Sequence, residues 1–202
     1  MKEKIYTTDT LSAKLSKTIE NAYRNVNIAF ANEMALVSES FGVNIYEIIE
    51  LINARHDRHM HIPGAGVGGH CLPKDPWLLR YGLYEYGTWK IEPEFISVAR
   101  RVNNHMPVHI ADLMENALQA KEVSIQDATV TILGIAYLED SDDTRNTPAA
   151  VLAAALQSRG ATVRLHDPYV KEWEFGLQES ETDLMKTASD ADCLVLVTKH
   201  AE

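Results

Sequence analysis

Four side chains of this sequence have the types and spacing of a site for covalent chemistry on a bound substrate. Lys17 and Asn21 stand four residues apart in a helical segment, so an ammonium group and an amide project from one face and could together stabilise an oxyanion. Cys71 follows the glycine-rich stretch GVGGH and precedes Asp75 by four residues, which suits a nucleophilic thiol with a carboxylate nearby. The ordinary alternative is a Lys and an Asn on a solvated helix face, beside a cysteine whose reactivity depends on its surroundings.

Histidines and the second cysteine raise two further possibilities. A zinc site is the first, because imidazole and thiolate are good zinc ligands; the candidate ligands are His56, His59, His61, His70 and Cys71. Their spacing fits no standard pattern, so we predict no metal. Cys193 lies in the apolar run ADCLVLVT and is predicted to be an inert thiol in a buried strand. The two cysteines occupy such different contexts that a disulfide is not expected.

Residues 64–69 satisfy the G-x-G-x-x-G pattern of a dinucleotide site, but their context argues against that function. The fingerprint works when a strand precedes it and the amino terminus of a helix follows it. We expect neither here, because Pro63 precedes the glycines and Pro73 and Pro76 follow them. The glycines are instead interpreted as positions where the backbone approaches a substrate.

Apolar periodicity predicts a mainly helical first part. Residues 11–41 form one long predicted helix, with no proline or glycine before Gly42, and a second helix is predicted from 44 to about 53. Residues 56–76 hold four glycines, three prolines and four histidines, and are predicted to be a loop. Helical periodicity returns after Pro93 and again over residues 108–118, where Pro107 would be a first-turn residue.

The pattern changes near residue 128. ATVTILG, ATVRLHDP and ADCLVLVT each predict a short buried strand, and TPAAVLAAALQSRG predicts a helix ending at Gly160. This alternation indicates a parallel α/β sheet. We therefore predict a mainly helical domain over residues 1–105 and an incomplete Rossmann-like α/β domain with a parallel sheet over residues 106–202. The loop after the first strand lacks the further glycines of a dinucleotide site but could hold a nucleotide through its amides and Arg145.

Composition limits the partners. The 202 residues include 46% hydrophobic ones, enough for a proper core, and 19 basic against 29 acidic residues give a net charge of -10. This charge argues against a nucleic-acid partner. No run approaches the roughly 18 apolar residues of a membrane span, and the first ten residues lack the apolar core of a signal peptide, so we expect a cytoplasmic protein without a membrane partner.

Three ordered motifs carry a resemblance to a known family. KTIENAYRNVNIAFANEMAL, PGAGVGGHCLPKDPWLL and ILGIAYLEDSDDTRNTPA closely resemble motifs of the UDP-glucose and UDP-N-acetylmannosamine dehydrogenases, over essentially the whole chain. NAYRNVNIAFANE and PGAGVGGHC look more like the N-acetylmannosamine branch. In that family NAD oxidises the sugar C6 alcohol twice, and a cysteine captures the intermediate aldehyde. The resemblance implies the same for the parent protein of this chain.

The resemblance also implies roles for individual residues. Cys71 matches the nucleophile, Lys17 and Asn21 match the oxyanion-stabilising pair, and Asp75 matches the carboxylate that assists proton transfer and thioester hydrolysis. The implied substrate-binding residues are Arg24, Arg58, Gly64, Gly66, Gly68, Gly69, Tyr137 and Arg145. The long helix 11–41 is implied to build a homodimer interface, and residues from 106 onward to begin the nucleotide-sugar-binding domain.

The sequence departs from the family pattern in three places. Leu138 stands after Tyr137, where the family usually has a lysine near the nucleotide sugar, which puts substrate affinity in doubt. Arg55 competes with Arg58 for the position of a substrate-contacting arginine. The family's amino-terminal NAD domain has no counterpart before Met1, so the chain by itself is expected to oxidise nothing and to leave NAD binding to a domain that it lacks.

Two other functions remain open from the sequence. One is a non-catalytic dimerisation or nucleotide-sugar-binding module, which Leu138 and the missing domain both favour. The other is a thiol hydrolase that uses Cys71 with His70, which has little support because adjacent residues on an extended chain point to opposite sides.

Overall fold

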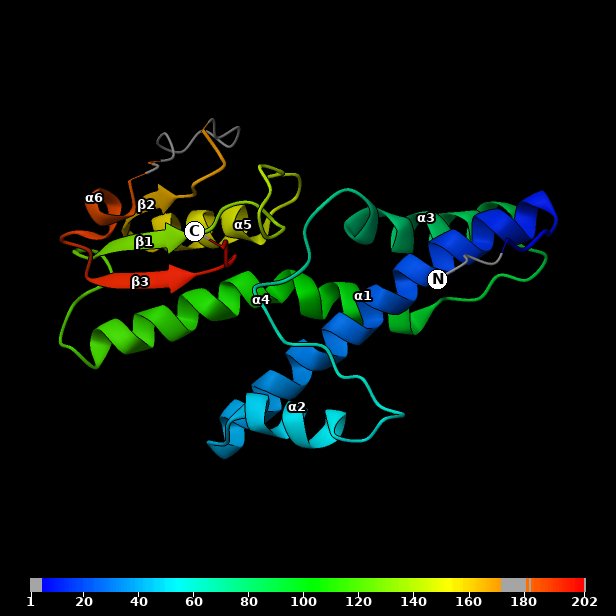
Figure 1. Cartoon of the computed structure of the whole chain (residues 1–202), viewed down its shortest axis with the longest axis horizontal. Coiled ribbons are helices and arrows are strands. Elements are labelled where there is room, and N and C mark those ends of the chain that lie inside the picture. Colours follow the sequence, from blue (N-terminus) through cyan, green and yellow to red (C-terminus); the bar gives the residue numbers. More distant parts are fainter. Residues whose placement is uncertain (1–4, 172–180, 182, 202) are drawn as a thin grey trace.

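A computed structural model describes residues 5–171, 181 and 183–201. Its helical part consists of α1 (Thr10–Phe41), α2 (Ile45–Asn53), α3 (Cys71–Tyr86) and α4 (Glu94–Gln119). Its α/β part consists of β1 (Thr129–Leu133), α5 (Pro148–Ser158), β2 (Thr162–His166), α6 (Leu184–Ala188) and β3 (Cys193–Leu196). The predicted fold class, a helical region followed by a small parallel sheet, is confirmed (Figure 1).

Helix α1 is bounded by strong local signals. The Asp9 side chain accepts a hydrogen bond from the Ser12 amide at its start, and Gly42 adopts a left-handed φ of 66° at its end. Its buried face is made of small residues and amides, such as Ala29 and Asn32, because this face packs closely against α3 and α4. Larger apolar side chains, including that of Phe30, lie on the exposed side.

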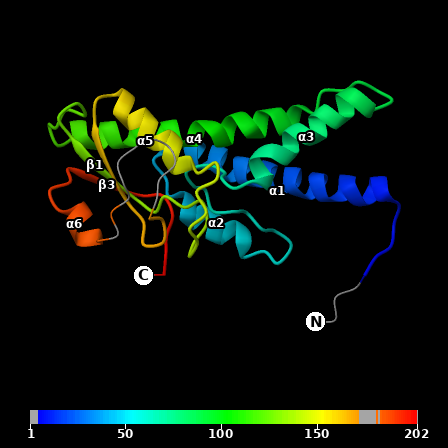
Figure 2. The ribbon, with the colours of Figure 1, turned by 90° about the horizontal axis from the view of Figure 1, so that it is seen from above.

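Helix α4 is a single helix where the sequence predicted two, so that prediction is wrong. Pro107 lies inside it and removes one backbone hydrogen bond. Tertiary packing outweighs this loss, because residues on both sides of the proline are buried, among them Asn103 and Met106 before it and Ala111 and Met114 after it. In Figure 2, α4 runs from the α/β part to the helices at the opposite end of the molecule. The helix passes the predicted boundary between residues 105 and 106 without a break.

Helix α3 corrects the prediction that residues 56–76 are all loop. The helix begins at Cys71, so the last six of these residues form its first turns. Pro73 occupies the third helical position, where a backbone N–H has no partner within the helix and its loss costs little. Pro73 therefore marks the start of a helix here, whereas Pro76 lies inside it. Residues 57–70 are irregular, as predicted.

The sheet of the α/β part is parallel, with strand order β2-β1-β3. His166 at the end of β2 makes a further parallel bridge to Glu181, which gives the order of segments 181-β2-β1-β3. This matches the 3-2-1-4 part of the strand order of a doubly wound Rossmann fold. The core lies between the sheet and helices α4 and α5, and its fully buried side chains include Val130, Ile132 and Leu156.

Strand β3 is less buried than predicted. It forms one edge of the described sheet, and its side chains alternate between half-buried and exposed. Leu194 and Leu196 are 51% and 62% exposed, whereas Cys193 and Val195 pack against the core. A continuous apolar run predicts a strand buried on both faces, but here one face of β3 lacks a cover among the described residues. Cys193 is accordingly half-buried rather than a fully enclosed core thiol.

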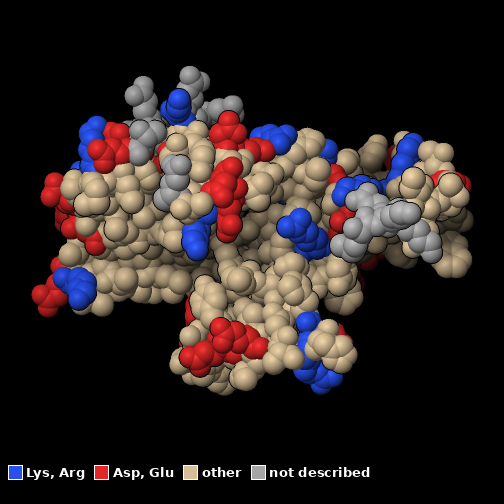
Figure 3. Space-filling view, viewed as in Figure 1, with Lys and Arg blue, Asp and Glu red and all other residues tan. Residues whose placement is uncertain are grey.

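Two further features are the hydropathy of the helices and the placement of the charged side chains. None of the helices within the described ranges has the length and hydropathy needed to cross a bilayer. On the face shown in Figure 3, basic side chains stand singly or in small groups among acidic ones.

Replacing Ile132 of β1 by Ala should lower the free energy of unfolding by about 2–5 kcal/mol, because it leaves a cavity in the core of the α/β part. Leu194→Ala, in the same sheet but on the exposed face, is the matched control and should cost less than about 1 kcal/mol. Urea unfolding followed by circular dichroism measures both. Equal losses for the two variants would contradict this location of the core.

Candidate functional site

Most of the predicted site residues surround one cavity of about 420 Å³. It lies between α1, the glycine loop (residues 64–69) and the segment that follows β1. The predicted site residues that line it are Lys17, Asn21, Arg24, Gly66, Gly68, Gly69, Cys71, Tyr137 and Arg145. The structure thus brings together residues from both parts of the chain.

Helix α1 supplies one wall of this cavity through a regular row of side chains. Lys17, Asn21, Arg24 and Ile28 follow one another at steps of four, three and four residues, which places them on one helix face. Sequence reasoning missed Ile28, although the same spacing that linked Lys17 to Asn21 would have reached it. Its apolar side chain adds a non-polar contact beside two cations.

Cys71 is exposed and is the first residue of α3. A helix amino terminus favours negative charge, because its backbone N–H groups point outward without helical partners. Asp75 lies one turn further along, is buried, and accepts a hydrogen bond of 2.6 Å from Asn21 Nδ2. The Asn21–Asp75 contact joins α1 to α3 directly beneath the cysteine.

Lys17 is held at the surface by Glu20, with 2.7 Å between Nζ and Oε2. The hydrogen bond to Glu20 and then its charge raise the pKa of Lys17, and the groups of Cys71 and Asp75 add to the same direction. Lys17 therefore stays protonated near the thiol. Glu20 takes one of the three N–H donors of this ammonium group, and the exposed ion pair contributes little stability, so Lys17 is able to donate to a further oxygen.

The glycine loop has almost no room for side chains. A Cβ atom on Gly68 would lie 2.4 Å from Tyr137 Cβ, and one on Gly69, where φ is +83°, would lie 2.8 Å from the Tyr137 ring. A Cβ atom on Gly66 would lie 2.8 Å from the Asn103 carbonyl oxygen. Gly64 alone of the four faces open space. Gly66, Gly68 and Gly69 therefore closely approach other parts of the protein.

Two hydrogen bonds join the glycine loop to the α/β part. The Gly69 amide donates to the Arg145 carbonyl at 2.7 Å, and Asn146 Nδ2 donates to the Gly69 carbonyl at 2.9 Å. Asn146 has a φ of 51°, a conformation that Asn adopts more readily than most residues. Sequence reasoning did not identify Asn146, because an Asn beside a proline-led helix ordinarily indicates only a turn.

Arg145 and the residues around Tyr137 form the α/β side of the cavity. The hydrogen bond from Arg145 to Asp143 raises the pKa of the guanidinium and lowers that of the carboxyl, so both groups stay charged. The pair holds an exposed cation at the cavity. Leu138, the departure noted in the sequence, also lines the cavity and is 53% exposed.

Two of the predicted substrate-binding residues lie outside this cavity. Arg58 pairs with Asp57 at 2.6 Å and lines a separate cavity of about 160 Å³ together with His59 and His61. Arg55 also contacts Asp57, so the structure brings neither arginine to Cys71 within this chain. Gly64 is held at the loop entrance, where its amide donates to Asn32 Oδ1.

Below the Tyr137 segment, a buried Asp167–His200 pair fixes the backbone that follows β1. Asp167 accepts hydrogen bonds from the amides of Ile135 and Ala136 through one oxygen and from those of Tyr169 and Val170 through the other. Burial alone would raise the pKa of Asp167, but these amides and His200 outweigh it and lower the pKa. His200 Nδ1 accepts from the Asp140 amide, so its Nε2–H donates to Asp167.

The described residues form neither a cluster of metal ligands nor a dinucleotide fingerprint. Within the described ranges, no three His, Cys, Asp or Glu side chains converge as they would around a metal ion. The glycine loop is followed by the amino terminus of α3, contrary to the sequence-based expectation. However, irregular chain rather than a strand leads into it, so it does not form a Rossmann fingerprint for NAD.

Family comparison agrees with this site. Residues 11–105 match the central domain of the UDP-glucose/GDP-mannose dehydrogenase family, and residues 131–202 match its UDP binding domain. The chain belongs to this family. The central-domain match contains the glycine loop and Cys71, and the UDP-binding match contains Tyr137 and Arg145.

Individual relatives are similar over nearly the whole chain. A UDP-N-acetyl-D-mannosamine dehydrogenase from Pyrococcus horikoshii is 41% identical over 100% of this chain and 45% of its own length. An NDP-N-acetyl-D-galactosaminuronic acid dehydrogenase from Ralstonia nicotianae is 33% identical over 96% of this chain and 44% of its own. The chain thus spans less than half the length of these relatives.

Solved structures give the same result. The UDP-D-ManNAc dehydrogenase structure from Pyrococcus horikoshii superimposes with a TM-score of 0.88 at 40% identity, over 99% of this chain and 45% of that one. The NDP-N-acetyl-D-galactosaminuronic acid dehydrogenase structure from Methanosarcina mazei gives a TM-score of 0.87 at 34% identity, over 94% of this chain and 41% of that one.

Gly68→Ala tests the contact between the glycine loop and Tyr137. The added Cβ cannot fit, so the loop must shift, and the free energy of unfolding should fall by about 1–3 kcal/mol. Gly64→Ala is the matched control, because its Cβ would meet open space and its cost should stay within about 0.5 kcal/mol. Chemical unfolding measures both, and a neutral Gly68→Ala would contradict this packing.

Asp167→Asn should destabilise the protein by about 1–3 kcal/mol near neutral pH, because an amide cannot accept from all the donors around Asp167. The lowered pKa means that the wild-type advantage is present above the unfolded value of 3.8 and is lost as pH falls through the folded pKa. Urea unfolding at several pH values should therefore show the two proteins converging in acid. Asp190→Asn, on the surface, should show no such convergence.

Proposed function

We propose that this chain is the cysteine-bearing and UDP-binding portion of an NAD-dependent UDP-sugar 6-dehydrogenase, which converts UDP-N-acetylmannosamine to its uronic acid. The observation that carries the proposal is the shared cavity: Cys71 opens α3 in the same space that Lys17, Asn21, Tyr137 and Arg145 enter. Membership of the family and the similarity to N-acetylmannosamine enzymes support the reaction and the sugar.

The thiol has a chemical role that its neighbours support. The Cys71 thiolate adds to the C6 aldehyde, so that an S–C bond forms while the carbonyl π electrons move to oxygen. The ammonium of Lys17 and the amide of Asn21 donate to the resulting oxyanion. Asp75, hydrogen-bonded to Asn21, accepts a proton from the water that later hydrolyses the thioester and releases the thiolate.

The oxidations themselves need a hydride acceptor. NAD is this acceptor. The described residues form no dinucleotide fingerprint that would hold NAD. NAD is therefore bound mainly by residues outside this chain, and the chain alone binds the nucleotide sugar without oxidising it.

The substrate is held from both sides of the cavity. Arg145 and Arg24 supply positive charge for the diphosphate, and the segment at Tyr137 contacts the nucleotide sugar. Gly66, Gly68 and Gly69 present backbone to the sugar beside Cys71. Arg58 lines a separate cavity from Cys71. It therefore contributes to substrate binding only if it reaches the site of a second copy of the chain.

A homodimer through α1 is part of the same proposal. Tyr23, Phe30 and Val37 are exposed at seven-residue steps, so they form an apolar stripe along one side of the helix. Such a stripe is suited to the same helix of a second copy. It also supports the alternative function, a dimerisation or nucleotide-sugar-binding module without catalysis, which the apolar Leu138 in the cavity favours.

Titration calorimetry with UDP-N-acetylmannosamine, UDP and NAD tests the proposal. Both uridine nucleotides should bind and NAD should not, and Arg145→Gln should weaken UDP binding by about 10- to 100-fold through loss of a charge-assisted contact. The control is Arg164→Gln, which removes a guanidinium that donates to the Ser189 carbonyl, and this variant should bind UDP normally. Absence of nucleotide binding would sink the proposal.

Iodoacetamide labelling separates the catalytic function from the binding-only alternative. UDP-N-acetylmannosamine should slow the alkylation of Cys71 more than UDP does, because only the sugar reaches the thiol. Cys193 is the internal reference, whose pKa is raised by burial and then by the Asp192 charge, and its rate should not change. Equal protection by both nucleotides would favour the binding module.

A further inference from the structure

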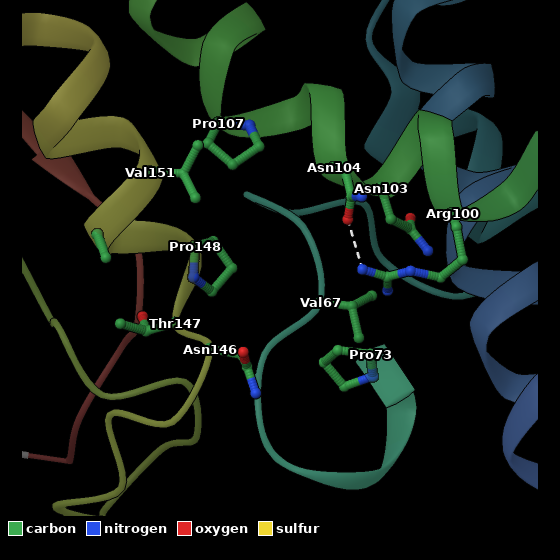
Figure 4. A pocket seen from close by; sticks show the side chains of 11 residues that line it. Val67, Pro73, Arg100, Asn103, Asn104, Pro107, Asn146, Thr147, Pro148 and Val151 are labelled. Carbon is green, nitrogen blue, oxygen red and sulfur yellow. Dashed lines mark hydrogen bonds between the residues drawn. The ribbon is translucent and has the colours of Figure 1, made fainter. Parts of the chain in front are cut away.

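A second cavity lies on the other side of the glycine loop from Cys71. Its volume is about 440 Å³, and it shares Val67 with the cavity at the cysteine. Helix α4 contributes Arg100, Asn103 and Asn104, and the start of α5 contributes Thr147 and Pro148. Figure 4 shows Arg100 and Asn104 facing Asn146 and Pro148 across this space, with Val67 of the glycine loop and Pro73 of α3 between them.

Arg100 is an unusual component of a protein interior. Its side chain is only 5% exposed, and in the described part of the chain no carboxylate pairs with it. Nη1 donates to Asn25 Oδ1 at 3.1 Å and Nη2 donates to Asn104 Oδ1, whereas Nε has no partner. These neutral amides use two of its five N–H groups. Within the described residues this buried positive charge is therefore uncompensated.

Such a charge is costly, and burial lowers the pKa of Arg100. A buried cation stays in a fold at low cost only when an anion pairs with it and hydrogen bonds satisfy its remaining donors. The cavity beside it is large enough for a small ligand and is also lined by Asn103, Asn104 and Asn146. Asn103 Nδ2 donates to two oxygens of Asn25, and Asn146 Nδ2 donates to the Gly69 carbonyl, so among the described residues the Asn104 amide group and one N–H of Asn146 are left to orient a ligand. The site therefore has a charge to neutralise and polar groups to orient what neutralises it.

Helix α5 adds to this field. Its amino terminus lines the cavity through Thr147, Pro148, Ala150 and Val151, and a helix amino terminus carries partial positive charge. The Ala149 and Ala150 amides already donate to Thr147, so the helix contributes its dipole more than free donors. Two independent positive features thus face one cavity.

We propose that this cavity behind the glycine loop is a second binding site, which takes a small oxyanion, a phosphate or a carboxylate, on the Arg100 guanidinium. Planar guanidinium groups bind both kinds of oxyanion through paired N–H donors. The ligand would sit against Val67 and Pro73, which precede and follow Cys71 in the chain. It is separate from the nucleotide cavity, which Lys17, Arg24 and Arg145 line.

Calorimetric titration of the whole chain with inorganic phosphate, and separately with acetate, tests this site. Both titrations are made at constant ionic strength and with UDP at saturation. Binding of either anion that survives UDP is expected, and the anion that binds identifies the ligand class. No uptake of either anion, or displacement by UDP, would overturn the proposal and leave the nucleotide cavity as the anion site.

Two pairs of variants locate the binding. Arg100→Met should weaken binding at least about tenfold, the loss of one charged contact, whereas Arg101→Gln removes a charge from the exposed neighbour and should bind normally. Val151→Glu places a carboxylate at the half-exposed rim of the cavity and should weaken binding, because its negative charge repels an oxyanion. Val151→Gln is its neutral match and should keep binding. This second pair decides the question even if Arg100→Met fails to fold, and wild-type affinity in Val151→Glu would refute the site.

Discussion

The geometry of the candidate site depends on how closely the glycine loop packs against its neighbours. Gly66 lies against the Asn103 carbonyl of α4, while Gly68 and Gly69 lie against Tyr137 of the α/β part. These contacts allow no side chain, so the loop has one position relative to both parts of the protein. Cys71 begins a helix directly after the loop, and its place at the cavity follows from that position.

A buried set of amides supports the loop from the helical side. Asn32 accepts from the Gly64 amide and donates to Asn103 Oδ1, and Asn103 in turn donates to Asn25. Because these groups are fully buried, each lost partner would leave a costly unsatisfied donor or acceptor. Directional bonds of this kind fix the register of α1 against α4 in a way that small apolar contacts do not. Pro107 contributes as well, because it leaves the Asn103 carbonyl without its helical donor at the point where Gly66 approaches.

Sequence patterns predicted those features that depend on local periodicity. The long helix, the three strands and the helix after β1 follow from apolar spacing, and the row that begins with Lys17 and Asn21 follows from helical geometry. The errors arose where tertiary packing decides. Pro107 stays within one helix because both flanks are buried, and Pro73 lies in the first turn of a helix within a segment whose composition is that of a loop. Neither Asn146 nor Arg100 could be identified, since each matters through contacts with residues distant in sequence.

The alternating exposure along β3 affects how the protein behaves in concentrated solution. Leu194 and Leu196 leave one face of an edge strand apolar and uncovered in the described part of the chain. A strand with an apolar face and a free hydrogen-bonding edge is a template for intermolecular pairing. At high concentration this strand therefore promotes association between molecules, and the net negative charge opposes it. A lysine at position 194 would address it without touching the core.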